Sequence, residues 1–423
     1  MPQINAMTKH YVIISDAVPH CYHGGGGITA YAAALSLLAA GNSVSVLALG
    51  NTGYTGNRPE NEHIAQLTAK GIDVTVLPDE PTLKKPAGLF DKLRMHVPII
   101  ETLFSGGYAK RALVREYLEG KSPDGVFMYH WGPIASAYGL RKFRKVGVVG
   151  DPVHMPVLLR MNFEKLYGAK KGLKELVIDR LTRFKLKFTV EAMKRLLMDC
   201  DVSGAFAAQE ADMFRGVGVK RCEYFRTPVM DPLPYHKAVA KPEKFKILHI
   251  GHLKGIATLM GVDLLAKEVL PALSTLLPEG SYEVHIVGGF FDSVPERLKQ
   301  SLRSDPHVLV RGYVDSAEEE FLSSQVVIVP TPVVLGIRVR IINAFSLGCA
   351  VVSHKANKAG IPELEHGYNC LLGGDGMELA KQCAALYNDP VLMSKLQKNA
   401  RDTYEKSFST ESAGGFIVRA MEG

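Results

Sequence analysis

Two arginines lie two residues apart in an otherwise apolar stretch, TPVVLGIRVRIINAFSLGCAVVSH, which spans residues 331–354. Apolar runs at both ends of this stretch predict buried strands, and the segment between them predicts a loop followed by a short helix. Arg338 and Arg340 therefore fall at a loop-to-helix turn, where guanidinium groups are suited to bind phosphate oxygens. Asn343, one helical turn further on, has an amide that both donates and accepts hydrogen bonds. The spacing predicts a site for a phosphorylated ligand; for each arginine the alternative is an ordinary solvated cation.

Glycines follow the first predicted strand in the manner of a phosphate-binding loop. The apolar segment YVIISDAV (11–18) is followed by HGGGG (23–27) and then by an alanine- and leucine-rich stretch that predicts a helix. Glycine lets the backbone approach a ligand closely, so Gly26 and Gly27 are candidates for contacts with an anion. The alternative is a turn that only lets helix and sheet pack together. The run lacks GxGxxG spacing, and no acidic residue follows in SVSVLALGNTG (43–53), which disfavours a dinucleotide-dependent oxidoreductase.

Apolar segments alternate with helical patterns in both halves of the chain, which predicts parallel, doubly wound sheets. The expected strands of the first half are YVIISDAV (11–18), SVSVLAL (43–49), IDVTVLP (72–78), GVFMYH (125–130) and VGVVGD (146–151). Those of the second half are FKILHIGHL (245–253), YEVHIVGG (282–289), HVLVRGYV (307–314), VVIVP (326–330) and CAVVSH (349–354). Between the halves, RTPVMDPLPYHKAVAKPEK (226–244) has four prolines and poor periodicity, which indicates a boundary.

We therefore expect two Rossmann-like domains that face each other across a central cleft. The predicted parts are a first domain over 1–228, a linker over 229–244, a second domain over 245–400 and a C-terminal helix over 401–423 that packs back on the first domain. Ligands of such sheets bind at the carboxyl ends of the strands, so both sites should open into the cleft.

Composition narrows the class of protein. The chain of 423 residues is 47% hydrophobic and 22% charged, as in a globular protein, and is long enough for two domains. It has no apolar run of the roughly 20 residues that span a bilayer, and its start lacks a signal-peptide pattern. The six cysteines form no CxxC pair, which suits a reduced cytoplasm and disfavours structural zinc. The net charge of +7 favours anionic partners.

The second half resembles the retaining GT-B glycosyltransferases of family four, which transfer sugars from nucleotide donors. The resemblance runs from ILHIGHLKG (247–255) to GYNCLL (367–372), with the usual order and spacing of segments. The first half is similar to the acceptor domain of that family in its Gly-Gly turn, in His130 and in AFAAQEADMFRGVGV (205–219). The resemblance implies an α/β, GT-B fold with an acceptor-binding N-terminal domain and a nucleotide-sugar-binding C-terminal domain.

The chain departs from the family at the motif that binds the donor. Two family glutamates, eight residues apart, fall on Leu335 and Asn343, and neither position is acidic. A subgroup of the family shows Gly-x-Arg-x-Lys-x-x-Glu, and GIRVRIIN (336–343) keeps its glycine and first arginine. The resemblance then implies that Arg338 and Arg340 hold a diphosphate and that Asn343 contacts the ribose, more weakly than a carboxylate would.

The resemblance and the strand ends together give three groups of candidate residues. The catalytic candidates are His130, Arg338 and Arg340. The donor-binding candidates are Gly26, Gly27, Gly251, His252, Lys254, Gly312, Tyr313, Leu335, Asn343 and Gly360. Acceptor or cleft candidates are Asp16, Asp151 and His154. For His130, Lys254 and Tyr313 the alternatives are, in turn, a structural histidine, an exposed loop lysine and a core tyrosine. No metal ligand set is expected, and no cofactor apart from the nucleotide-diphospho-sugar co-substrate.

A basic segment, residues 165–197, has no counterpart in the resemblance. Residues 165–195 hold ten Lys and Arg against three Asp and Glu, and apolar residues recur among them at helical spacing. One interpretation is a helix lying on an anionic membrane, which would suit a lipid-linked acceptor. The other is a helix packed on its own domain with a solvated basic face. Nucleic acid is not expected as a partner, because no aromatic stacking platform accompanies the charge.

The sequence predicts an enzyme of glycan, glycolipid or polysaccharide biosynthesis that moves a sugar to a hydroxyl of a glycan, a lipid-linked or a small-molecule acceptor. In such a retaining transferase the departing diphosphate takes the proton of the acceptor. The main alternative, left open by the loss of both glutamates, is a non-catalytic GT-B protein that binds nucleotide or glycan, or a partner subunit. A GT-B epimerase or an inverting transferase is a further alternative. We expect a cytoplasmic location, at the inner membrane face if the basic segment binds lipid.

Overall fold

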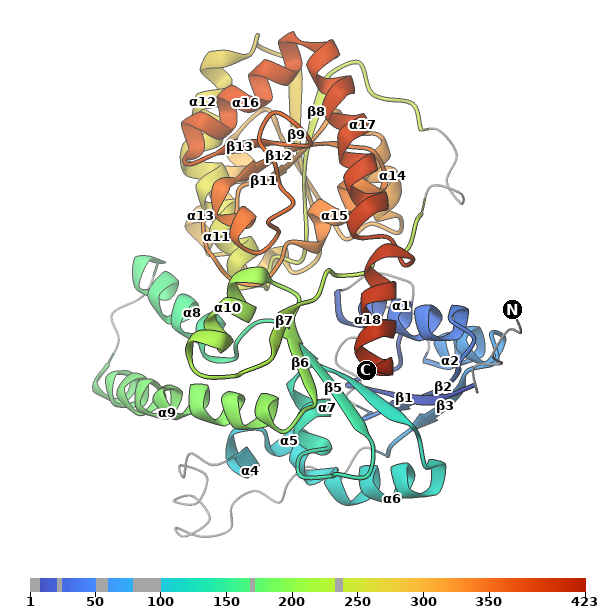
Figure 1. The fold of residues 1–423 in the computed structure, drawn as a ribbon. Coiled ribbons are helices and arrows are strands. Elements are labelled where there is room, and N and C mark those ends of the chain that lie inside the picture. The colour runs from blue at the N-terminus through green and yellow to red at the C-terminus, as the bar shows by residue number, and fades with distance from the viewer. Residues whose placement is uncertain (1–7, 21–24, 51–59, 79–99, 168–171, 233–238) are drawn as a thin grey trace, which may run out of the picture.

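The computed structural model shows two α/β domains, one above the other in Figure 1. The structure describes residues 8–20, 25–50, 60–78, 100–167, 172–232 and 239–423. Each domain is built on a parallel sheet, which confirms the predicted doubly wound, GT-B type of architecture.

The N-terminal domain has a seven-stranded sheet in the order β3-β2-β1-β4-β5-β6-β7. Its strands are β1 (His10–Ser15), β2 (Ser43–Ala48), β3 (Asp73–Val76), β4 (Gly125–Tyr129), β5 (Arg144–Val149), β6 (Val202–Ala205) and β7 (Cys222–Tyr224). Its helices are α1 (Gly25–Ala39), α2 (Glu60–Thr68), α4 (Ile100–Leu103), α5 (Ser105–Ala109), α6 (Arg111–Lys121), α7 (Trp131–Ser136), α8 (His154–Tyr167), α9 (Leu173–Met198) and α10 (Ala208–Gly216). All pairings in this sheet are parallel, for example Tyr11 with Val44 and with Gly125.

The C-terminal domain has a six-stranded sheet in the order β10-β9-β8-β11-β12-β13. Its strands are β8 (Phe245–Ile250), β9 (Tyr282–Val287), β10 (Val308–Gly312), β11 (Val326–Val329), β12 (Ala350–His354) and β13 (Leu371–Gly373). Its helices are α11 (Ile256–Leu264), α12 (Leu270–Leu276), α13 (Glu296–Ser304), α14 (Ala317–Leu322), α15 (Val339–Ser346), α16 (Gly376–Asn388) and α17 (Pro390–Ser407), and the chain ends in α18 (Ser412–Glu422). A π-helical segment, Leu265–Val269, joins α11 to α12, and short 3₁₀ turns cover Phe291–Ser293 and Lys355–Ala359.

Burial explains why the sequence predicted most strands. Central strands such as β4 and β8 are buried at every position, because helices cover both faces of each sheet. Strands buried on both faces consist of continuous apolar runs, and such runs are visible in the sequence. The sequence reading missed β6, β7 and β13, whose sequences VSGA, CEY and LLG are short.

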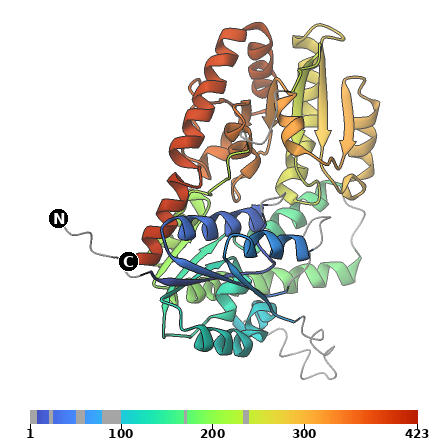
Figure 2. The same cartoon turned by 90° about the vertical axis from the view of Figure 1, so that its right-hand side faces the viewer.

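The chain crosses back to the N-terminal domain at its end (Figure 2). Helix α17 runs through residue 400 to Ser407, so the predicted boundary at 400/401 falls inside this helix. Helix α18 then packs on α1, β4 and β5 and buries Ile417 and Met421 in the N-terminal core. This last helix therefore ties the two domains together.

Candidate functional site

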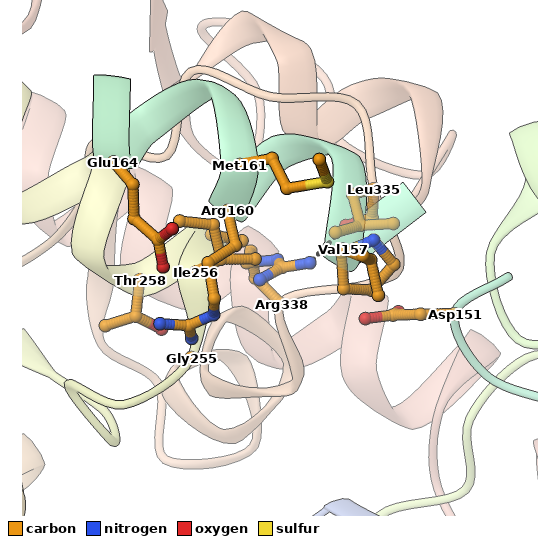
Figure 3. Close-up of a pocket in the computed structure, with 12 residues that line it drawn as sticks. Asp151, Val157, Arg160, Met161, Glu164, Gly255, Ile256, Thr258, Leu335 and Arg338 are labelled. Atoms are coloured by element: carbon orange, nitrogen blue, oxygen red, sulfur yellow. Dashed lines mark hydrogen bonds between the residues drawn. The ribbon is translucent and has the colours of Figure 1, made fainter. Parts of the chain in front are cut away.

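A cavity of about 370 Å³ lies between the domains (Figure 3). Helix α8 and Asp151 line it from the N-terminal domain, and the start of α11 with the loop before α15 lines it from the C-terminal domain. Its polar side chains are Asp151, Arg160, Glu164, Thr258 and Arg338. Asp151 and Arg338 point toward one another across this space from opposite domains (Figure 3). The cavity has a volume typical of small-molecule sites.

Arg338 is the residue immediately before α15, with φ −100° and ψ 84°. Its side chain donates to the backbone oxygen of Leu335, and its Nε is buried without a hydrogen-bond partner. Burial lowers the pKa of Arg338, and the charges of Asp151 and Glu210 raise it in part. The guanidinium forms no ion pair within the described residues, so a bound anion would relieve the cost of its burial.

Arg340 makes structural hydrogen bonds that the sequence did not predict. It lies in the first turn of α15, and its guanidinium donates to the Ile250 oxygen (2.9 Å), Thr258 Oγ1 (3.2 Å) and Thr331 Oγ1 (3.0 Å). These acceptors belong to the end of β8, to α11 and to the segment after β11. Arg340 therefore joins three elements at the carboxyl edge of the sheet, and both of its Nη atoms are occupied. Its contact with a diphosphate stays a prediction.

We expect Arg340→Ala to lower the free energy of unfolding of the protein by about 2 kcal/mol, since hydrogen bonds from a charged donor contribute about this much. Arg340→Lys should recover part of the loss, because one ammonium cannot reach all three acceptors. Arg297→Ala, at an exposed arginine of α13, is the control. Urea denaturation followed by fluorescence measures the change. Equal stability of Arg340→Ala and wild type would contradict this structural role.

The loop before Arg338 is held from the opposite domain. Gly336 has φ +56°, and a Cβ added there would overlap Asp151 Oδ1, so this position requires glycine. The Gly336 amide donates to Glu210 Oε1 at 2.6 Å. The sequence did not predict a role for Glu210, because an acidic residue in the first turn of a helix is common.

Two of the donor-binding candidates on this side of the cleft lie in or beside that contact. Leu335 is only 3% exposed and packs in the core, although it also lines the cavity. Gly360 lies where a Cβ would be 2.6 Å from the Gly336 oxygen, and its own oxygen accepts from the Ala208 amide at 3.2 Å. Gly360 is thus needed for the domain contact.

The third candidate, Asn343, lies one turn beyond Arg340 on α15 and is partly exposed. Residues three apart share a helix face, so Asn343 lies on the side of α15 that carries Arg340. Its contact with a ribose stays a prediction.

The loop after β8 approaches the next strand closely. Gly251 has φ +149°, and a Cβ there would overlap Arg340 Nη1. Beyond it, His252 and Lys254 are exposed, and both contact the ring of Phe290. The ring centroids of His252 and Phe290 are 5.8 Å apart, and Lys254 Nζ lies 5.6 Å from the Phe290 centroid. Both side chains are therefore open to solvent at the end of β8.

The loop after β10 contains the candidates for contacts with the base. Gly312 has φ +68°, and Tyr313 is 50% exposed. Tyr313 is therefore not a core residue. Gly312 supplies the left-handed turn that the end of β10 requires.

The N-terminal candidates lie at the carboxyl ends of β1, β4 and β5. His130 follows β4 with φ 82°, an unfavourable backbone conformation for a residue with a side chain, and its amide donates to the Val148 oxygen at 2.9 Å. Burial lowers the pKa of His130 to about 4, so its imidazole is neutral at physiological pH. A strained, neutral histidine at this edge is suited to donate or accept a hydrogen bond from a ligand.

The other three N-terminal side chains differ in position. Asp151 lines the cavity, and burial raises its pKa, opposed by Arg338. Asp16 lies against Gly132, where a Cβ would overlap its Oδ1. His154 begins α8, and its Nδ1 is buried without a partner. Of these three residues, the structure brings Asp151 to the cavity with Arg338.

The predicted Gly-Gly turn is part of a helix. Gly26 and Gly27 lie in the first turn of α1, whereas the residues just before it, 21–24, lie outside the described part of the chain. A Cβ at Gly27 would be 2.5 Å from His20 Nε2, so glycine is required by close packing. Amides in the first turn of a helix have no intrahelical acceptor, so the amides of Gly26 and Gly27 can still bind an anion from this helical position.

Helix α9 presents apolar side chains to solvent. Leu173, Val177, Leu181, Phe184 and Phe188 are 84%, 55%, 52%, 56% and 37% exposed, and their spacing of three or four places them on one helix face. We call these five residues the α9 stripe. The stripe faces solvent, while α9 packs on its own domain through other positions, as the second interpretation expected; contact with a membrane stays a prediction.

The opposite face of α9 makes the contacts with the N-terminal domain. Thr189 and Met193 lie on that face and are buried. Ala192, Leu196 and Leu197 join the core of the domain. The C-terminal half of α9 therefore packs on the core of the N-terminal domain, and the stripe faces solvent.

Across the described ranges, no helix is long and apolar enough to cross a membrane. Within the same residues, no cluster of three His, Cys, Asp or Glu side chains could hold a metal ion.

Two facing Rossmann-like domains with a cavity at the carboxyl ends of their sheets define the GT-B fold. Residues 244–389, the C-terminal domain, match the family described as Glycosyl transferases group 1. The chain therefore has the GT-B fold, and its C-terminal domain is similar to this glycosyltransferase family. The comparison with curated proteins gives no match.

Solved structures of low identity share this fold over nearly the whole chain. Sucrose-phosphate synthase from Thermosynechococcus elongatus matches with a TM-score of 0.68 at 15% identity, over 98% of both chains. HepE from Anabaena, solved with UDP and glucose, matches with a TM-score of 0.63 at 14% identity, over 98% of this chain and 99% of HepE. WaaG, a glycosyltransferase involved in lipopolysaccharide biosynthesis, matches with a TM-score of 0.60 at 13% identity, over 98% of this chain and 100% of WaaG.

Proposed function

We propose that this protein is a retaining glycosyltransferase that moves a sugar from a nucleotide-diphospho-sugar to a hydroxyl group of an acceptor. The observation that carries the donor assignment is Arg338 at the edge of the interdomain cavity, a half-buried cation that forms no ion pair with the part of the chain that the structure describes. A diphosphate is an anion of suitable charge for it. HepE, which shares the fold, is solved with UDP, so uridine nucleotides are the first donors to test.

The proposed reaction breaks the bond between the anomeric carbon of the sugar and the diphosphate. The electron pair of that bond leaves with the diphosphate, and the acceptor oxygen forms the new bond on the same face of the sugar. The departing phosphate takes the proton of the acceptor hydroxyl, so no separate side-chain base is needed.

The protein stabilises the negative charge on the departing phosphate. Arg338 and the first-turn amides at Gly26 and Gly27 would do this from the two sides of the cleft. Lys254 and Arg340 stay candidates for the same diphosphate. Neutral His130 would hydrogen-bond the donor sugar, and Asn343 the ribose.

We further propose that the acceptor is presented at an anionic membrane surface. Helix α8 lines the cavity through Val157, Arg160 and Met161, and α8 packs on α9, which carries the stripe. Exposed Arg180 and Lys187 lie on α9 beside the stripe. An apolar face with cations at its margin is the arrangement of a helix that lies in a membrane interface. WaaG, of the same fold, acts in lipopolysaccharide biosynthesis, which agrees with a lipid-linked saccharide acceptor.

The test is a transfer assay that detects free nucleoside diphosphate with UDP-, GDP- and ADP-sugars, in the presence and absence of lipid-linked saccharide acceptors. We expect acceptor-dependent release with one donor, and a product whose anomeric configuration equals that of the donor by NMR. Inverted configuration would overturn the retaining mechanism. Nucleotide binding without release in any combination would favour the non-catalytic alternative.

A further inference from the structure

The first turn of α10 holds two loops of the opposite domain. The Ala208 amide donates to the Gly360 oxygen at 3.2 Å, and Gln209 Nε2 donates to the Gly336 oxygen at 3.3 Å. Glu210 Oε1 accepts from the Gly336 amide at 2.6 Å. Three consecutive residues of the N-terminal domain thus bind the C-terminal domain, and two of them, Gln209 and Glu210, bind the loop that leads to Arg338.

Glu210 is the buried member of this contact. Glu210 is 3% exposed, and its second oxygen, Oε2, is buried without a hydrogen-bond partner among the described residues. The groups that act on it electrostatically are Asp151 and Arg338, and it acts in turn on Tyr129 and Cys222. Burial, reinforced by Asp151 and opposed by the Gly336 amide and Arg338, raises the pKa of Glu210 to about 8, so the protonated form predominates at pH 7.

The position of the Gly336 amide decides where Arg338 points. Only one residue separates Gly336 from Arg338, and Gly336 is held at φ +56° between Glu210 on one side and Asp151 on the other. The backbone oxygen of Leu335, in the same loop, accepts a bond from Arg338. A change at Glu210 would therefore move the loop and with it the guanidinium.

We propose that Glu210 is a positioning residue of the donor site: it reaches across the domain interface and holds loop 335–338 so that Arg338 faces the donor phosphates. This inference rests on the proposed function, because it presupposes a nucleoside diphosphate beside Arg338. Glu210 itself does not line the cavity. It acts through Gly336 and Arg338.

The charge of Glu210 gives this role a signature that a purely structural contact lacks. When Glu210 is neutral, the positive charge of Arg338 attracts only the diphosphate. When Glu210 is ionised, its carboxylate competes with the diphosphate for Arg338 and repels the ligand. The bound diphosphate in turn disfavours ionisation of Glu210, so binding raises its pKa and takes up a proton above pH 8. Affinity for the diphosphate should therefore fall as the pH rises through about 8.

The experiment is titration calorimetry of the full chain with UDP, GDP and ADP between pH 6.5 and 9.5. For the nucleotide that binds, we expect the wild-type Kd to rise about fivefold or more across this range, a usual size of coupling between two sites. Glu210→Gln keeps an acceptor oxygen and no charge, so it should match the wild type at pH 7 and lack the rise. Glu210→Ala leaves the Gly336 amide unpaired and should bind about tenfold more weakly at pH 7, equivalent to about 1.4 kcal/mol.

A matched control is Glu363→Gln. Glu363 also spans the domains, through Arg226 (2.6 Å) and Tyr224 (3.0 Å), but it does not touch loop 335–338. We expect it to keep the wild-type pH profile. A Glu210→Gln profile equal to that of the wild type would overturn the proposal, and so would wild-type affinity in a folded Glu210→Ala. A wild type that binds none of the three nucleotides would overturn the donor assignment as well, which separates the two failures.

Discussion

We expect Arg338→Ala to lower kcat/KM for glycosyl transfer by about two to three orders of magnitude, as for the loss of one preorganised donor to developing negative charge. The charge that leaves with the nucleotide is largest in the transition state, and Arg338 is the half-buried cation that lines the cavity without an ion pair in the described residues. Its removal therefore raises the barrier more than it weakens ground-state binding. Steady-state kinetics with the donor identified in the transfer assay measures the change.

Two variants make this result specific. Arg338→Lys should recover part of the rate, because an ammonium keeps the charge but cannot bind two phosphate oxygens as a planar fork. Arg297→Ala removes an exposed arginine of α13 and should leave kcat/KM unchanged. A loss of less than tenfold in a folded Arg338→Ala would mean that the diphosphate binds elsewhere, with Lys254 the next candidate.

The second large effect concerns the α9 stripe. We expect the double variant Leu181→Glu, Phe184→Glu to lose binding to anionic lipid vesicles by about two orders of magnitude or more, because burying each such side chain contributes about 1.5–3 kcal/mol. Both side chains are more than half exposed in the structure, so the exchange should not unfold the helix. Sedimentation with vesicles of phosphatidylcholine and phosphatidylglycerol measures the partition coefficient.

The control for this prediction is another exposed apolar residue. Val391, at the start of α17, is 80% exposed and lies outside the α9 stripe, so Val391→Glu should leave vesicle binding unchanged. Arg180→Glu with Lys187→Glu should weaken binding to anionic but not to neutral vesicles, and more at low salt. Equal vesicle binding by the stripe variant and the wild type would contradict a membrane role. A wild-type dimer that the stripe variant abolishes would show instead that the stripe joins two copies of the chain.

The sequence could predict the fold because buried parallel strands and their helices leave local patterns. Ten segments predicted from apolar runs contain the observed strands or overlap them, for example β8 within 245–253. Very short strands carry too little pattern, as β13 with its three residues shows. The solvent exposure of the α9 stripe could not be predicted either, since the same periodicity arises whether an apolar face packs on its own domain or points to solvent.

The site was harder to predict than the fold, because its contacts join residues far apart in the chain. Arg340 and Ile250 are separated by 90 positions, and the contact of Glu210 with Gly336 spans 126. No local pattern distinguishes an arginine that binds three carbonyl and hydroxyl oxygens of its own domain from one that awaits a ligand. The sequence did predict Arg338 and Asp151 as site residues, because Arg338 lies just before a helix and Asp151 just beyond a strand, at the edge of the sheet where ligands of this fold class bind.

The most direct test of the donor assignment is a crystal structure of the wild type with UDP bound. We expect the diphosphate at the carboxyl ends of β8 and β11, with its oxygens about 2.7–2.9 Å from the guanidinium of Arg338, as for charge-assisted hydrogen bonds. UDP bound at another surface, with Arg338 still directed only at the Leu335 oxygen, would contradict the assignment and with it the proposed mechanism.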